Sequence, residues 1–167
     1  MKKSLKVLAL PGYDPEIGRW LWALEDVRRT IIERLNGISQ DTLDRKIENK
    51  TVGSLLYHIA LIEADWFYVE VLRTDFDPEI KQLFPEEART EDGSLATVSG
   101  QSLEEHFHRL TAVRQKLLSR FMNMDLQDFR RPRQLEQYDV SPEWVIYHLI
   151  EHEAHHRGQI FQMLNQA

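Results

Sequence analysis

The sequence predicts an all-α protein, a four-helix bundle with one long crossover connection between its second and third helices. Apolar residues recur at three- and four-residue spacing over four long segments. Most glycines and prolines fall between these segments, and a stretch without helical repeats separates the second segment from the third. A chain of 167 residues can bury one core of this kind, so we expect a single domain over residues 1–167.

The first helix is expected to begin at Asp14, which can cap a helix whose first residue is Pro15. It is expected to end at Asn36, which precedes a glycine. Its apolar stripe comprises Ile17, Trp20, Leu21, Leu24, Val27, Ile31 and Leu35. The segment before Asp14 is either a short strand or a strap across the bundle.

The second helix is expected to run from Thr51 to Leu72. Its apolar stripe consists of Leu55, Ile59, Ile62, Trp66 and Val69. Residues 73–101 then contain several Pro and Gly turn signals and few helical repeats. We therefore predict a long connection with a short helix near residues 79–83.

The third helix begins with Ser102 and Glu105, whose spacing is typical of a capping box. A polar, arginine-rich connection follows this helix. The fourth helix begins at Ser141, which precedes a proline and a glutamate, and runs toward Leu164.

The composition excludes several classes of function. Lys and Arg number 21 against 27 Asp and Glu, and a net charge of −6 argues against nucleic acid or anionic lipid as a partner. The absence of cysteine excludes disulfides, thiolate metal sites and a cysteine nucleophile. No apolar run reaches the ~18 residues that a membrane span needs. We therefore expect a cytoplasmic protein without a membrane partner.

Four of the seven histidines fall within nine residues of the last helix: His148, His152, His155 and His156. At ~100° per residue, His152 and His156 point with the apolar face of that helix. His148 and His155 lie on a polar strip, where a solvated side chain is the simplest interpretation.

Two imidazoles four residues apart on one face can bind a single cation from the same side. The alternative is a pair of neutral core histidines that are hydrogen-bonded to carbonyls or carboxylates. A third ligand must come from another helix. We favour His58 over His106, because Leu55, Ile59 and Ile62 surround His58 on the inward face of its helix.

The string from His152 to His156 also matches the HExxH motif of zinc proteases, in which the glutamate is a general base. Common zincins take their third ligand downstream of this motif. No His, Asp or Glu follows His156, which argues against a protease of this type. Glu153 is then expected either near the metal, as a base or orienting group, or in an ion pair with a neighbouring helix.

The second helix contains Leu-Leu-Tyr-His-Ile-Ala at residues 55–60, and the last helix contains His-Glu-Ala-His-His-Arg-Gly-Gln at residues 152–159. In combination, these two motifs resemble those of the DinB family, also called DinB/YfiT-like, of metal-dependent helical bundles. The resemblance covers about residues 14–165, and the HHRGQ tail is its more specific part.

The resemblance implies a divalent metal ion, found in the family as nickel, zinc, iron or manganese. Carried over to this sequence, its ligands are His58, His152 and His156, the same three that helical phase selects. The resemblance also implies an S-transferase-type activity in which the metal activates a low-molecular-weight thiol, such as bacillithiol or mycothiol. A homodimer is implied as well, and Trp20 and Trp22 add apolar surface for such a contact.

No residue of the sequence identifies the substrate, which we expect to be a small molecule. Glu153 and Gln159 are candidates for orienting a ligand or a metal-bound water. Arg157 is expected to be an ion-pair partner, and Gly158 a point of close approach between helices. Two alternatives to the transferase remain open: a hydrolase that uses a metal-bound water, and a non-catalytic metal-binding bundle.

Overall fold

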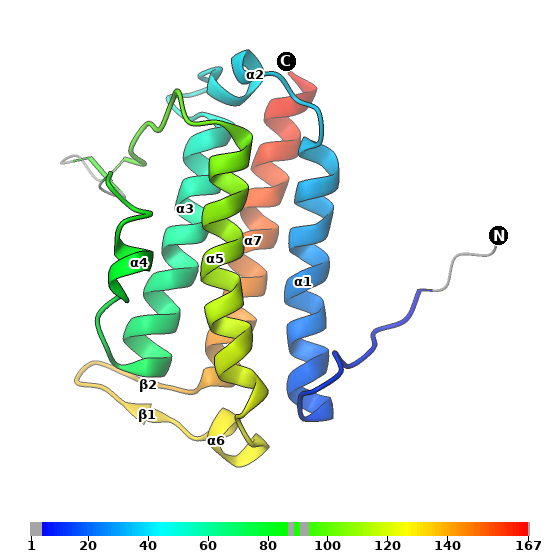
Figure 1. Cartoon of the computed structure of the whole chain (residues 1–167), viewed down its shortest axis with the longest axis vertical. Coiled ribbons are helices and arrows are strands. Elements are labelled where there is room, and N and C mark those ends of the chain that lie inside the picture. Colours follow the sequence, from blue (N-terminus) through cyan, green and yellow to red (C-terminus); the bar gives the residue numbers. More distant parts are fainter. Residues whose placement is uncertain (1–4, 87–88, 91–93, 167) are drawn as a thin grey trace.

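The computed structural model describes residues 5–86, 89–90 and 94–166, and most of these residues are helical. Long helices that lie side by side form the body of the molecule (Figure 1). They are α1 (Pro15–Leu35), α3 (Val52–Asp65) with its continuation η1 (Trp66–Leu72), α5 (Leu103–Met122) and α7 (Pro142–Asn165). The mostly helical character predicted from the sequence is confirmed. Each helix start or end that the sequence predicts lies within two residues of the one observed.

The long helices begin where side chains can satisfy their free N–H groups. The carboxylate of Asp14 accepts a hydrogen bond of 2.8 Å from the backbone N–H of Glu16. Ser102 and Glu105 form the predicted capping box at the start of α5, in which each side chain accepts from the backbone N–H of the other residue. Caps of this kind contribute about 1 kcal/mol each to helix stability.

The connections contain more structure than the sequence predicts. Two short helices, α2 (Gln40–Asp44) and α6 (Leu126–Arg130), were not expected, and neither was the antiparallel pair of β1 (Arg133–Gln134) with β2 (Asp139–Val140). The short helix expected near residues 79–83 is α4 (Pro78–Lys81). One turn of helix or two residues of strand are too short to show a hydrophobic period, which is why the pattern missed them.

The segment before α1 is neither of the two expected forms over its described residues, 5–13. It contains no strand and leads away from the helices as an extended tail (Figure 1). Leu5 is 82% exposed, and the tail is tied to α1 where the N–H of Leu10 donates to the carbonyl of Gly18 at 3.1 Å.

The second predicted helix changes type near its end. Residues of η1 follow α3 without a break but adopt π-helical geometry, and the segment stops at Arg73, whose φ of 60° is left-handed. A π-helical segment is uncommon and is frequently found at functional sites. Within this segment Phe67 and Val71 are buried, whereas Val69 of the expected apolar stripe is 46% exposed, so that part of the stripe was wrong.

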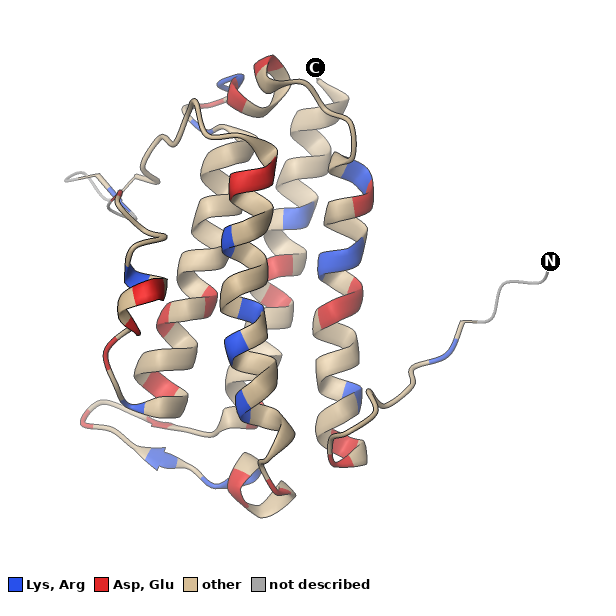
Figure 2. Ribbon diagram, in the orientation of Figure 1, with Lys and Arg blue, Asp and Glu red and all other residues tan. Residues whose placement is uncertain are grey.

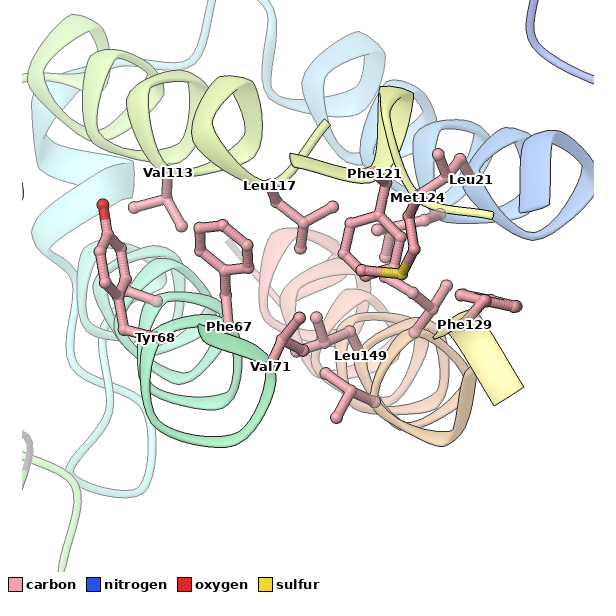
Figure 3. Packing of buried hydrophobic residues seen from close by; sticks show 14 of the residues in the cluster. Leu21, Phe67, Tyr68, Val71, Val113, Leu117, Phe121, Met124, Phe129 and Leu149 are labelled. Atoms are coloured by element: carbon pink, nitrogen blue, oxygen red, sulfur yellow. The ribbon is translucent and has the colours of Figure 1, made fainter. Parts of the chain in front are cut away.

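The core is divided into two apolar clusters. α1 packs against α7, and α3 packs against both α5 and α7. One cluster lies toward the β1–β2 end and contains Phe67, Leu117 and Phe121 (Figure 3), and the other contains Leu56 and Ile160 and lies toward α2. No helix within the described residues is long and apolar enough to cross a membrane.

A layer of buried charge separates these clusters. Arg28 of α1 and Arg114 of α5 each bind both Glu63 of α3 and Glu153 of α7, and all four side chains are 2–7% exposed. Figure 2 shows basic positions on α5 and acidic positions on α3 and α7 near the middle of the helical body. Because the two guanidinium groups and the two carboxylates balance, this layer buries no net charge of its own.

Candidate metal centre

Three histidine side chains from α3 and α7 converge beside the charged layer. His58, His152 and His156 offer ring nitrogens that all lie within 4.8 Å of one another. The Nε2 atom of His152 lies 3.1 Å from Nε2 of His58 and 3.1 Å from Nε2 of His156. The structure therefore brings together the three histidines that helical phase selects.

The local fold explains this convergence. His152 and His156 are four residues apart on α7, so their rings lie one turn apart on the same face, with centroids separated by 4.4 Å. His58 projects from α3, which packs directly against α7, and its ring lies 4.9 Å from that of His156. His58 is buried, whereas the other two rings are half-buried and leave one side of the site open.

Burial keeps these imidazoles neutral at physiological pH. It lowers the pKa of His58 to about 4, with smaller contributions from the positive charges of His156 and Arg89. It lowers the pKa of His152 to about 3, where the neighbouring histidines add to the effect, and burial also lowers the pKa of His156. Neutral imidazole is the form whose nitrogen lone pair can bind a cation.

The donor set fits a divalent metal ion. Each neutral imidazole carries one N–H and one lone pair, so three converging Nε2 atoms cannot all be satisfied by bonds among themselves. His156 Nδ1 lies 2.9 Å from Oε1 of Gln159, which leaves Nε2 of His156 as the ligand atom. A cation bound at the three Nε2 atoms would satisfy the lone pairs that cannot be paired among the rings.

The open side of the triad faces a cavity of about 330 Å³. His58, His156 and Gln159 line it together with Lys50 and Arg89, which come from the connections before α3 and after α4. Both cations are close enough to lower the pKa of His156 by charge repulsion. Glu48 also lines the cavity, so two basic groups and one acidic group surround the space next to the histidines.

A model of the DinB superfamily matches residues 23–160. The chain belongs to the DinB superfamily. The match includes all three converging histidines. A search of curated proteins found no match to the chain.

The other histidines of this DinB protein lie outside the triad. His106, the rival for the third position, is buried, and its Nδ1 atom contacts Arg109 instead. His155 is exposed, as expected. The expectation that His148 is a solvated side chain is wrong, because its ring is half-buried and stacks on Trp144 at a centroid distance of 5.1 Å. Trp66 of η1, whose ring lies 4.6 Å from that of His148, adds cover that the phase of α7 alone does not predict.

Glu153 does not face the triad. Its carboxylate accepts hydrogen bonds from Arg28 and Arg114, so it belongs to the charged layer, which is one of the two expected roles. Arg157 donates to the hydroxyl of Thr30 at 3.1 Å, and among the described residues it forms no ion pair. Gly158 is not a point of close approach, because a Cβ there would have no neighbour within 4 Å.

Sequence reasoning missed the basic residues of the cavity. Lys50 and Arg89 lie in connections that are far from the triad along the chain, and neither belongs to a motif. The one available signal for this wall of the cavity was the turn before Thr51. In the structure, Glu48 and Asn49 of this turn adopt left-handed backbone angles, with φ of 50° and 64°.

Proposed function

We propose that this protein is a divalent-metal-dependent enzyme that transfers a low-molecular-weight thiol to an electrophilic substrate. The observation that carries the proposal is the convergence of three neutral imidazoles, two of which line a cavity that Lys50 and Arg89 also line. Superfamily membership supports a metal-dependent function. The identity of the metal-activated group as a thiol is a further step of the proposal.

His58, His152 and His156 would hold the cation through their Nε2 atoms. A divalent ion with only three protein ligands retains open coordination positions and stabilises the anionic form of a thiol or water bound there. Nickel, zinc, iron and manganese all accept imidazole ligands, so the donor set alone does not select among them. Burial of the three imidazoles removes competition from protons, and Gln159 fixes the ring of His156.

Lys50 and Arg89 would bind acid groups of the thiol and orient its sulfur toward the histidines. Their charge next to the site also favours a thiolate over a thiol. The protein contains no cysteine, so the sulfur must come from the bound molecule. In the transfer, the sulfur forms a bond to an electrophilic carbon, the leaving group departs with the bonding electrons, and the thiol proton passes to solvent.

The chain would act as a single four-helix-bundle domain in which residues 73–101 form the crossover between α3 and α5. We also propose that it forms a homodimer. Trp20 is a weaker candidate for the contact than expected, because its ring packs on Tyr147 and its Nε1 donates to Glu143 at 3.3 Å. Light scattering that shows only monomer at micromolar concentration would exclude the dimer.

Metal analysis of purified variants tests the triad. His58→Ala, His152→Ala and His156→Ala should each lose most of the bound metal, because two imidazoles hold a divalent ion much more weakly than three. His155→Ala is the matched control, since this exposed histidine is on the same helix and should leave metal content unchanged. Equal metal content in the wild type and the three triad variants would contradict the proposed site.

Optical titration tests the thiol. Protein loaded with cobalt or nickel should develop a sulfur-to-metal charge-transfer band when a low-molecular-weight thiol is added, and His152→Ala should not. Replacement of Lys50 and Arg89 by Gln should weaken binding of an acidic thiol more than binding of 2-mercaptoethanol. If no thiol changes the spectrum but ester or amide hydrolysis depends on the metal, the hydrolase alternative is correct. If neither occurs, the protein is a metal-binding bundle without this chemistry.

A further inference from the structure

A second pocket lies at the other end of the α3–α7 interface. Its walls are Trp66 of η1, Trp144 at the start of α7, and Tyr138, Asp139 and Val140 of the hairpin, and its volume is about 330 Å³. We call it the aromatic pocket. Its volume is at the lower end of the range of small-molecule sites, ~300–1,000 Å³.

The aromatic pocket is separate from the histidine triad. Trp144 precedes His152 by eight residues on α7, which corresponds to roughly 12 Å at ~1.5 Å per residue. None of the three converging histidines lines it. His148 lies between the two sites, with its ring 4.6 Å from that of Trp66 and 6.0 Å from that of His152.

The aromatic walls are held in place before any ligand binds. The ring centroids of Trp66 and Trp144 lie 5.2 Å apart and the ring planes are inclined at 48°, so the two indoles contact each other and form one continuous aromatic wall. The ring of His148 stacks on Trp144 at an angle of 5° and also lies 4.6 Å from the ring of Trp66, so the three rings support one another. The hydroxyl of Tyr138 donates to Oε1 of Glu70 at 2.6 Å, which ties the hairpin wall to η1.

The exposure of these rings is unfavourable unless something covers them. Trp144 and Tyr138 are 44% and 45% exposed, although each is large enough to contribute substantially to a core. Exposed aromatic side chains that gather around a concave site are typical of a binding surface. The rings therefore identify the pocket as a place where an apolar surface binds.

The charges around the aromatic pocket are acidic. Asp139 lines it, Glu70 is bonded to Tyr138, and both Glu70 and Asp65 raise the pKa of Tyr138. None of these three acids forms a salt bridge within the described part of the chain, and Oε2 of the buried Glu70 has no hydrogen-bond partner there. Arg73 of the same region donates to the carbonyl of Gln134 and does not line the pocket.

These features select one class of ligand. Indole faces carry negative electrostatic potential and attract cations, and the neighbouring carboxylates add to that attraction. A primary ammonium ion is strongly hydrated and would lose its water against apolar walls. An alkylated ammonium ion combines positive charge with an apolar surface and matches both the rings and the acids.

We propose that the aromatic pocket is a binding site for a small quaternary ammonium compound. Its trimethylammonium group would lie in the pocket against the wall formed by Trp66 and Trp144, close to Tyr138 and Asp139. The proposal does not depend on the metal centre, because none of the histidine ligands takes part in it. It can therefore be tested on metal-free protein, and its failure would not affect the proposed thiol chemistry.

Titration with choline, followed by NMR of the four indole N–H signals, tests the proposal. Addition of choline chloride at constant ionic strength should shift the signals of Trp66 and Trp144 saturably and leave those of Trp20 and Trp22 in place. The neutral molecule 3,3-dimethylbutan-1-ol has the same shape without the charge, and it should bind at least tenfold more weakly. Equal binding of the two molecules would show a merely apolar pocket, and no saturable shift with choline would show no site. Either result overturns the proposal.

Variants locate the site independently of the spectra. Trp144→Leu keeps apolar bulk but removes one π face, and it should weaken choline binding at least tenfold, as measured by calorimetry. Asp139→Asn should weaken it severalfold while leaving the affinity for the neutral alcohol unchanged. Trp22→Leu is the control for loss of an indole elsewhere. Folding of each variant is checked by circular dichroism, and unchanged choline affinity in folded Trp144→Leu would contradict the proposal.

Discussion

Replacement of Glu153 by glutamine separates a structural role of this residue from a chemical one. Glu153 follows the proposed ligand His152 and stands at the glutamate position of an HExxH string. In the structure its carboxylate accepts hydrogen bonds from Arg28 and Arg114 inside the helical body. We therefore expect Glu153→Gln to reduce the stability of the fold and to leave the metal content of the folded protein intact.

The magnitude follows from the burial of the charged layer. The side chain of Glu153 is 2% exposed, and those of its two arginine partners are 7% and 5% exposed. Its replacement leaves one buried positive charge without a partner, and breaking such a pair costs ~3–5 kcal/mol. The half-exposed Glu25 also contacts Arg114 and offsets part of this charge. We therefore expect a loss of about 3 kcal/mol, at the lower end of that range.

Urea denaturation of the metal-free protein measures this loss. The variant Glu151→Gln, at an exposed position of the same helix, should change the unfolding free energy by less than ~0.5 kcal/mol. The effect of Glu153→Gln should persist at 1 M salt, where the screening length is ~3 Å, because the layer is buried. An unchanged unfolding free energy together with loss of metal would refute this reasoning. It would show that Glu153 acts at the metal site instead.

Further predictions concern stability and are tested by the same denaturation assay. Burial, followed by the charge of Arg109, lowers the pKa of His106 from 6.5 to about 4. The unfolded chain therefore binds a proton before the folded chain does, and this histidine should remove about 3 kcal/mol of stability as the pH falls from 6.5 to below 4. His106→Gln should lose this part of the pH dependence, and a variant whose stability changes with pH as the wild type does would contradict the assignment. Gly53→Ala should destabilise the fold, because its Cβ would lie 3.0 Å from Nε2 of His106, whereas Gly158→Ala should stabilise α7 by up to ~1 kcal/mol. Ser102→Ala should cost about 1 kcal/mol through loss of the capping box, and no change would show that the cap contributes nothing.

The long helices could be predicted because each repeats its apolar stripe over several turns and begins at a recognisable cap. The signals at Asp14 and Ser102 predicted the starts of α1 and α5 correctly. The change to π-helix at Trp66 could not be predicted, because apolar residues lie on both sides of the expected stripe and the sequence does not show which of them the wider turn will bury. The hairpin was missed for a different reason: its strands are two residues long and its sequence is mostly polar.

The histidine triad could be predicted because helical phase depends only on residue number. His152 and His156 share a face of one helix, and the apolar neighbours of His58 placed it on an inward face of another. The charged layer could not be predicted in the same way. Arg28 lies between Leu24 and Ile31 at helical spacing, and Arg114 lies in the same way between Leu110 and Leu117, so phase alone would place both on apolar faces. The carboxylates that pair with them come from other helices. Long-range pairing of this kind leaves no local pattern.

The charged layer and the triad share two helix segments. α3 contributes His58 to the triad and Glu63 to the layer, and α7 contributes His152 and its neighbour Glu153. Arg114 binds the two carboxylates at 2.7 Å and 2.9 Å, so it holds α3 and α7 in one register. A slip of one residue, ~1.5 Å along either axis, would break these contacts and would also separate the Nε2 atoms of the triad. The buried ion pairs therefore specify the alignment of α3 and α7 on which the metal centre depends. This specificity explains why the fold contains four buried charged side chains although their desolvation is unfavourable.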